Sequence, residues 1–111
     1  MANQGDRAGN VTFVNRFTVA GEPDDFEKVF ARIAEFMTAQ PGILGYTLSR
    51  HVDDPKRYVN IARWENVQAL RAAVAEPDFQ EHVRELRQLA ESESELYVER
   101  QRYLDENTPA S

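Results

Sequence analysis

The chain has 111 residues, a length that suits one domain with one hydrophobic core and excludes a two-domain enzyme. Its 13 basic and 19 acidic side chains give a net charge of −6, so it lacks the positive surface that binds nucleic acid or anionic lipid. Because the chain contains no cysteine, disulfides, thiolate nucleophiles, iron–sulfur clusters and cysteine-based zinc sites are excluded.

The first part of the chain predicts a strand followed by a long helix. Residues 1–9 are small and polar, and we expect a flexible tail there. Apolar and polar side chains alternate over residues 11–19, which is typical of a strand. Apolar residues then recur at helical spacing over residues 23–39, after a proline that suits the first helical position. The Pro41-Gly42 pair ends this helix.

The middle of the chain predicts a hairpin. Residues 43–52 form a second strand candidate and residues 57–65 a third. Between them, Asp53-Asp54-Pro55 is typical of a turn. His51 lies at this turn, where a solvated role is the simpler interpretation.

The last part predicts a helix in two pieces and a final strand. Asn66 is expected to cap a short helix that ends near residue 74, and Glu76-Pro77-Asp78 begins a second helix. The acidic segment 91–95 reads as a charged break before a fourth strand at 96–104. Residues 105–111 are expected to be a second flexible tail.

The resulting order is β-α-β-β-α-β, with the second helix broken in two. Right-handed connections then give an α+β, ferredoxin-like domain over residues 10–104, in which helices cover one face of a four-stranded antiparallel sheet. The other face would be bare and partly apolar, which predicts a homodimer. No apolar run approaches the roughly 20 residues of a membrane span, and we expect a cytoplasmic protein without nucleic-acid or membrane partners.

Two asparagines stand where a plain core is expected. Period two places Tyr58, Asn60 and Trp64 on one face of the third strand, and Asn15 interrupts the apolar face of the first strand. A buried amide without a partner costs about 1–3 kcal/mol. Because these strands are neighbours in the predicted sheet, both amides can line one cavity under the helices. The alternative is that they bind each other or the backbone and serve only the fold.

These residues carry a family resemblance. The spacing Asn60-x-x-x-Trp64 in a hairpin strand resembles the antibiotic biosynthesis monooxygenase family, and three further segments are similar in order and spacing. They are Val14-Asn15-Arg16-Phe17, Pro41-Gly42 and Pro77-Asp78-Phe79. The resemblance covers roughly residues 10–103 and implies a dimeric α/β barrel.

One branch of that family oxidises aromatic polyketides with O2 and without metal or flavin. The resemblance therefore implies a monooxygenase of secondary metabolism whose partners are a small anthrone, phenol or quinol and O2, with no cofactor. Asn60 would donate its amide to the substrate oxyanion, and Trp64 would stack on the ring or donate its indole N–H. The chain also has no glycine-rich phosphate loop, so a flavin would need an unconventional site.

Two alternatives remain open. A haem-degrading branch uses an asparagine that matches Asn15, but its tryptophan position falls near Ala73 and its axial histidine is expected one residue beyond His82. A non-catalytic protein that binds a polyketide or assists its cyclisation would use the same scaffold.

Further candidates follow from their place along the chain. His82, with an ordinary pKa near 6.5, is a possible base at the cavity edge, although the flank of an amphipathic helix is the simpler role. The candidate substrate-binding residues share an aromatic or apolar side chain facing the expected cavity: Phe13, Phe30, Tyr46, Tyr58, Phe79 and Val83.

Overall fold

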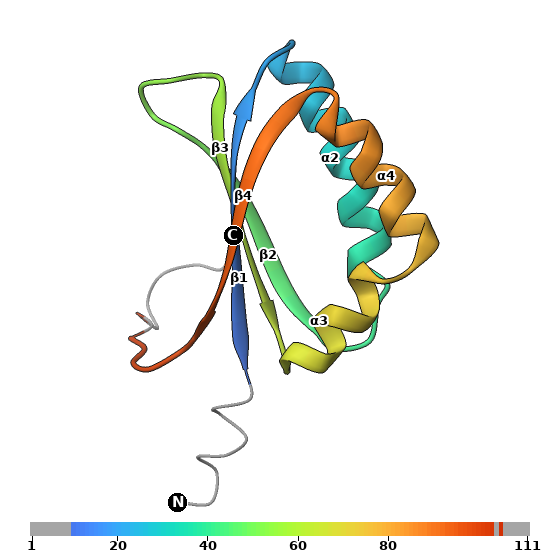
Figure 1. Cartoon of the computed structure of the whole chain (residues 1–111). Coiled ribbons are helices and arrows are strands. Elements are labelled where there is room, and N and C mark those ends of the chain that lie inside the picture. The colour runs from blue at the N-terminus through green and yellow to red at the C-terminus, as the bar shows by residue number, and fades with distance from the viewer. Residues whose placement is uncertain (1–9, 104, 106–111) are drawn as a thin grey trace, which may run out of the picture.

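Seven elements follow in the order β-α-β-β-α-α-β (Figure 1). The computed structural model describes residues 10–103 and 105, so the predicted tails lie outside the described residues, apart from residue 105. The elements are β1 Val11–Val19, α2 Pro23–Thr38, β2 Ile43–Arg50, β3 Arg57–Trp64, α3 Val67–Val74, α4 Pro77–Arg87 and β4 Ala90–Val98. The predicted ferredoxin-like class and the broken second helix are confirmed.

The four strands form one antiparallel sheet in the order β2-β3-β1-β4. The two strands that carry the asparagines, β1 and β3, are therefore the central neighbours that the sequence predicts. Among the described residues, all three helices lie on one face of the sheet, and none covers the opposite face (Figure 1). Within the described part of the chain, none of the helices is both long and apolar enough to cross a membrane.

The helices begin where local chemistry favours it. Pro23 opens α2, with Asp24 in its first turn near the positive end of the helix dipole. Asn66 caps α3, because its side-chain oxygen accepts a hydrogen bond from the backbone N–H of Ala69 at 2.8 Å. The buried face of α2 then supplies much of the core through Phe26, Val29, Phe30, Ile33 and Ala34.

Gly42 lets the chain pass closely under α3. Its φ of 94° lies in the region that favours glycine, and a Cβ built there would come within 2.5 Å of the Cβ of Ala69. The carbonyl of Gly42 also accepts a hydrogen bond from the backbone N–H of Glu65 at 2.8 Å. This contact holds the start of β2 beside the end of β3.

The fourth strand was predicted in the wrong place. The structure places β4 at Ala90–Val98, so the acidic segment 91–95 is inside the strand and not a break before it. All nine residues of β4 pair with β1, from Val19↔Ala90 to Val11↔Val98. Glutamates are tolerated here because the strand is at the sheet edge and alternate side chains point away from the helices. The predicted end at Leu104 lies outside the described residues.

The hairpin strand β2 ends two residues before its predicted end at Val52. His51 instead shapes the turn, where its Nδ1 accepts hydrogen bonds from the backbone N–H groups of Asp53 at 3.0 Å and Asp54 at 3.2 Å. The solvated turn role of His51 is thus confirmed.

Candidate active site

A small inner cavity lies between the helix-covered face of the sheet and the helices. Its volume is about 70 Å³, and its amide and indole groups come from the neighbouring strands β1 and β3. It brings together eight of the ten predicted site residues: Phe13, Asn15, Phe30, Tyr46, Asn60, Trp64, Phe79 and Val83. The rest of its wall is apolar, apart from these amides and the tryptophan and tyrosine polar groups.

Three buried polar atoms in this lining have no hydrogen-bond partner among the described residues. They are Oδ1 of Asn15, Oδ1 of Asn60 and the indole Nε1 of Trp64. An unsatisfied buried polar group costs about 1–3 kcal/mol. Their concentration around one cavity indicates groups kept for a ligand that offers both a donor and an acceptor.

The sheet register fixes the position of the two amides. Asn15 on β1 and Asn60 on β3 are direct partners in the antiparallel pair, so both side chains face the cavity. No hydrogen bond joins the two side chains in the described structure, because both amide oxygens lack a partner. The alternative in which the two asparagines satisfy each other is therefore not what the structure shows.

Trp64, the last residue of β3, also lines the cavity. Its side chain is completely buried and packs in a second core cluster with Val11, Ala62, Leu70 and Ala73. The indole therefore has a rigid position, with its N–H free to donate to a ligand.

A second, larger chamber adjoins the inner cavity on the side of β4. Its volume is about 560 Å³, and it shares with the inner cavity Phe13, Asn15, Phe17, Phe79, Val83 and Leu86. Its remaining wall includes polar side chains from three elements, namely Arg71, Gln80, Arg87, Ser92 and Ser94. Sequence reasoning missed the serines because it treated the segment that carries them as a break.

Two predicted site residues lie outside the inner cavity. Tyr58 is buried against Phe26, with ring centroids 4.7 Å apart, and its hydroxyl donates to Oε2 of Glu27 at 2.6 Å. Burial, and then the Glu27 carboxylate, raise the pKa of Tyr58 above its ordinary value of 10.0. His82 is half-buried on α4 and is not among the residues that line either chamber.

The candidate metal ligands are spread apart in the described structure. Within residues 10–103 and 105, no three histidine, aspartate or glutamate side chains lie close enough together to hold a metal ion. The chemistry that the cavity offers is instead that of amide and indole groups in an apolar surround.

The chain has the ferredoxin-like fold and the helix-covered cavity of a small monooxygenase domain. The chain belongs to the antibiotic biosynthesis monooxygenase family, whose model matches residues 10–85.

Individual proteins and solved structures are also similar to this chain. The chain is 50% identical over 99 residues to deoxynogalonate monooxygenase of Streptomyces nogalater, covering 89% of this chain and 84% of that protein. It matches the crystal structure of SnoaB, a cofactor-independent oxygenase from the same organism, with a TM-score of 0.85 and 49% identity. That match covers 88% of this chain and all of the solved one. A mycobilin-producing haem oxygenase of Mycobacterium tuberculosis is 35% identical over 63 residues, which is 57% of this chain and 60% of that protein.

Proposed function

We propose that this protein is a cofactor-independent monooxygenase that oxidises an aromatic polyketide substrate, such as an anthrone, phenol or quinol, with O2. The observation that carries the proposal is the set of three unpartnered polar atoms around one otherwise apolar cavity. The similarity to deoxynogalonate monooxygenase and to SnoaB supports the same chemistry. The proposal includes a cytoplasmic location, as expected from the sequence.

The substrate itself supplies the electrons in this reaction. An anthrone loses a proton from its methylene carbon, and the resulting carbanion shares its charge with the ketone oxygen as an oxyanion. The carbanion reduces O2, a carbon–oxygen bond forms, and protonation gives a hydroperoxide. Loss of water then breaks the O–O bond, so that one oxygen atom becomes the new ketone and the other becomes water.

The cavity can favour the deprotonated substrate. Amide N–H groups of Asn60 and Asn15, and the indole N–H of Trp64, would donate to the oxyanion as it forms, while an amide oxygen would accept from a phenol. Preorganised donors in a dry site are worth about 2.7–4 kcal/mol each in transition-state stabilisation. The aromatic and aliphatic wall from α2 and α4 keeps water away from the carbanion.

A haem-degrading activity fits the site less well. Such an enzyme needs an axial histidine in the cavity, and His82 is outside the lining of both chambers. The position at which the haem branch carries a tryptophan falls near Ala73, which is buried in the α3 core cluster.

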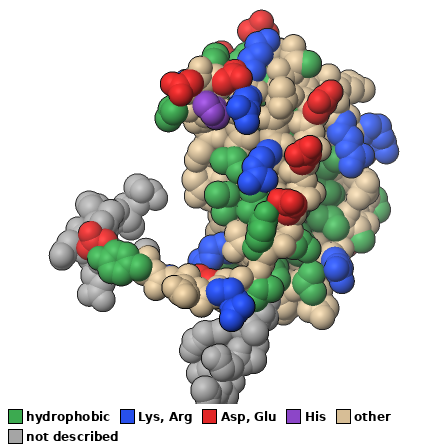
Figure 2. All heavy atoms as spheres, turned by 60° about the vertical axis from the view of Figure 1, so that its left-hand side comes forward, with side chains coloured by type: hydrophobic (Ala, Val, Ile, Leu, Met, Phe, Trp, Pro, Cys, Tyr) green, Lys and Arg blue, Asp and Glu red, His purple; other side chains and the backbone are tan. Residues whose placement is uncertain are grey.

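We propose that a second copy of this chain covers the bare sheet face. Hydrophobic side chains gather on that face, interspersed with charged ones (Figure 2). By register, Val14, Val59 and Ile61 point to this side, and Ile61 is 41% exposed. A partly apolar sheet face of this kind is rarely left open to water.

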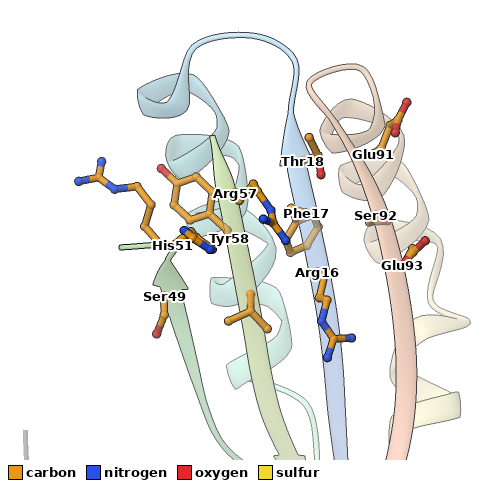
Figure 3. A pocket seen from close by; sticks show the side chains of 12 residues that line it. Arg16, Phe17, Thr18, Ser49, His51, Arg57, Tyr58, Glu91, Ser92 and Glu93 are labelled. Carbon is orange, nitrogen blue, oxygen red and sulfur yellow. The ribbon is translucent and has the colours of Figure 1, made fainter. Parts of the chain in front are cut away.

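Charges on the same face support a self-complementary interface. Arg16 of β1 and Arg57 of β3 line a groove of about 750 Å³ together with Glu91 and Glu93 of β4 (Figure 3). A two-fold axis would bring the basic side of one copy to the acidic side of the other. Sedimentation equilibrium should give twice the 12.7 kDa chain mass, and a monomer at micromolar concentration would contradict the dimer.

The proposed activity is tested with purified protein and an anthrone. Oxygen uptake that equals quinone formation, in the absence of added metal or cofactor, is the expected result. Tight binding of the anthrone without oxygen uptake would favour the non-catalytic polyketide-binding alternative. A Soret band on titration with haem, followed by haem breakdown, would favour the haem alternative.

A further inference from the structure

Met37 places a thioether in the wall of the inner cavity. It lies near the end of α2 and lines the cavity together with Asn60 and Trp64. Its side chain also packs against both core clusters, so it lies where they meet. Because the chain has no cysteine and its other methionine is Met1, Met37 carries the only sulfur atom among the described residues.

The end of α2 holds the backbone of Met37 in place. Its carbonyl accepts a hydrogen bond from the backbone N–H of Gln40 at 3.0 Å. Its side chain is half-buried, unbranched and polarisable. A leucine of similar volume would fill an apolar wall about as well, so packing does not require the sulfur. The thioether is therefore a reactive group in the cavity that the proposed mechanism does not use.

A thioether is a target for the intermediate that the proposed reaction forms. The carbanion and O2 give a hydroperoxide in the cavity, and its O–O bond is weak. A thioether takes up one oxygen atom and becomes a sulfoxide, and Met37 is the only thioether in the lining. Two groups held in one cavity react far faster than the same groups free in solution. A hydroperoxide that is slow to lose water therefore has a second fate beside Met37.

We propose that Met37 is a modification site that the substrate hydroperoxide oxidises during turnover. The distal oxygen of the hydroperoxide moves to the Met37 sulfur, so that the O–O bond breaks and an S–O bond forms. The hydroperoxide proton moves to the oxygen that stays on carbon, and the substrate leaves as an alcohol instead of a ketone. The hydroperoxide is reduced by two electrons, and the thioether is oxidised by two. This inference rests on the proposed function.

The sulfoxide at Met37 inactivates the cavity in which it forms. Oxidation turns a flexible apolar side chain into a polar one, and the new oxygen is a hydrogen-bond acceptor. The indole N–H of Trp64 has no partner among the described residues and is free to donate to it. The sulfoxide thus competes with the substrate oxyanion for the donors of Trp64 and Asn60. Activity is then lost in step with turnover.

The test follows oxygen from ¹⁸O2 into the protein. Wild type is supplied with an anthrone and ¹⁸O2 in the presence of catalase, which removes free hydrogen peroxide. Trypsin cleaves after Arg32 and Arg50, so the peptide 33–50 contains Met37 as its only methionine. This peptide should gain one ¹⁸O atom, in a yield that rises with the quinone formed while the rate falls. Label that appears only without catalase would assign the oxidation to released peroxide and overturn direct transfer.

Leu89→Met provides the matched control within one protein. Leu89 is half-buried like Met37 and packs against the same core, but it lines neither chamber. Trypsin cleaves after Arg87 and Arg100 and so isolates position 89 in the peptide 88–100. The label at Met37 should exceed the label at position 89 at least about tenfold, because only Met37 shares a cavity with the hydroperoxide. Equal labelling of the two positions would overturn the proposal.

Met37→Leu tests whether the sulfoxide causes the loss of activity. Each protein is compared with its own initial rate, and the fraction of that rate lost per turnover should fall severalfold when the sulfur is absent. The same loss per turnover in Met37→Leu and wild type would contradict inactivation through Met37. The labelling comparison in Leu89→Met needs no change at Met37, so it decides the transfer step whether or not Met37→Leu folds.

The two proposals fail in different ways. If wild type forms no quinone from the anthrone, the proposed function is wrong. If wild type forms quinone over many turnovers and Met37 gains no ¹⁸O, the enzyme assignment stands and only the oxidation of Met37 is wrong. Melting temperatures of the variants within a few degrees of wild type confirm that the differences come from folded protein.

Discussion

Replacing Asn60 by alanine should separate catalysis from stability. The side chain is 8% exposed, and its amide oxygen has no partner among the described residues, so the amide makes no side-chain hydrogen bond that the fold depends on. If the amide N–H stabilises the substrate oxyanion, Asn60→Ala removes one preorganised donor. The expected loss in kcat is about 10²–10³-fold, or about 2.7–4 kcal/mol of transition-state stabilisation.

The stability of Asn60→Ala should change little. Removing the unpartnered oxygen relieves a cost of about 1–3 kcal/mol. Against this, truncation loses packing at about 24 cal/mol per Å³ of cavity, which is a small term for so few atoms. The melting temperature should therefore stay the same or rise slightly.

Asn66→Ala is the matched control, because it removes the same side chain from a structural position. Asn66 accepts the capping hydrogen bond from the backbone N–H of Ala69, and its loss should cost about 1 kcal/mol of unfolding free energy. For a domain of this size that is about 4–8 °C in melting temperature. Activity at a temperature where the variant is folded should be unchanged.

Steady-state oxygen uptake and thermal unfolding of both variants give the answer. We expect a rate loss without a stability loss for Asn60→Ala, and a stability loss without a rate loss for Asn66→Ala. An Asn60→Ala protein that keeps its full rate but melts several degrees lower would refute the catalytic role and favour the purely structural one.

Three further outcomes are expected. Gly42→Ala should cost at least about 2 kcal/mol of unfolding free energy, because Gly42 has a positive φ and an added Cβ would overlap the Ala69 side chain. In the control Gly45→Ala, the added Cβ meets nothing within 4 Å, so the unfolding free energy from denaturant titrations should stay within about 0.5 kcal/mol of wild type. The pKa of Tyr58 is raised above 10.0 in the folded protein, so its contribution to stability is complete below pH 10 and is lost as the pH rises through the folded value. The stability difference between wild type and Tyr58→Phe should therefore shrink above pH 10, and a difference that grows there would contradict the burial and hydrogen bond assigned to Tyr58. His82→Gln should keep kcat within about twofold, because His82 lines neither chamber; a large loss of kcat in a variant that folds normally would restore it as the base.

The inner half of the site could be predicted because it depends on alternation within strands. Once residues 11–19 and 57–64 are strands, period two places Asn15 and Asn60 on the core side, where an amide is costly and therefore informative. The side chains opposite them on α2 and α4 followed from helical spacing. The family resemblance added the chemistry, which no spacing by itself contains.

The outer half could not be predicted for a physical reason. Alternating serines and glutamates have low strand propensity, and only pairing with β1 along all nine residues makes the segment a strand. The places of Ser92 and Ser94 in the wall of the outer chamber therefore could not be predicted from the sequence. Similarly, Tyr58 shares a face with Asn60, but alternation does not tell where a cavity ends, and Tyr58 lies beyond it against Phe26 and Glu27.

The most direct test of the account is the fate of labelled oxygen in a metal-free reaction. Purified protein is treated exhaustively with chelator, checked for the absence of flavin and haem absorbance, and supplied with an anthrone and ¹⁸O2. We expect undiminished turnover, with one ¹⁸O atom in the new ketone and the other in water. Activity that is abolished by the chelator and restored by iron, or that requires added haem, would contradict it.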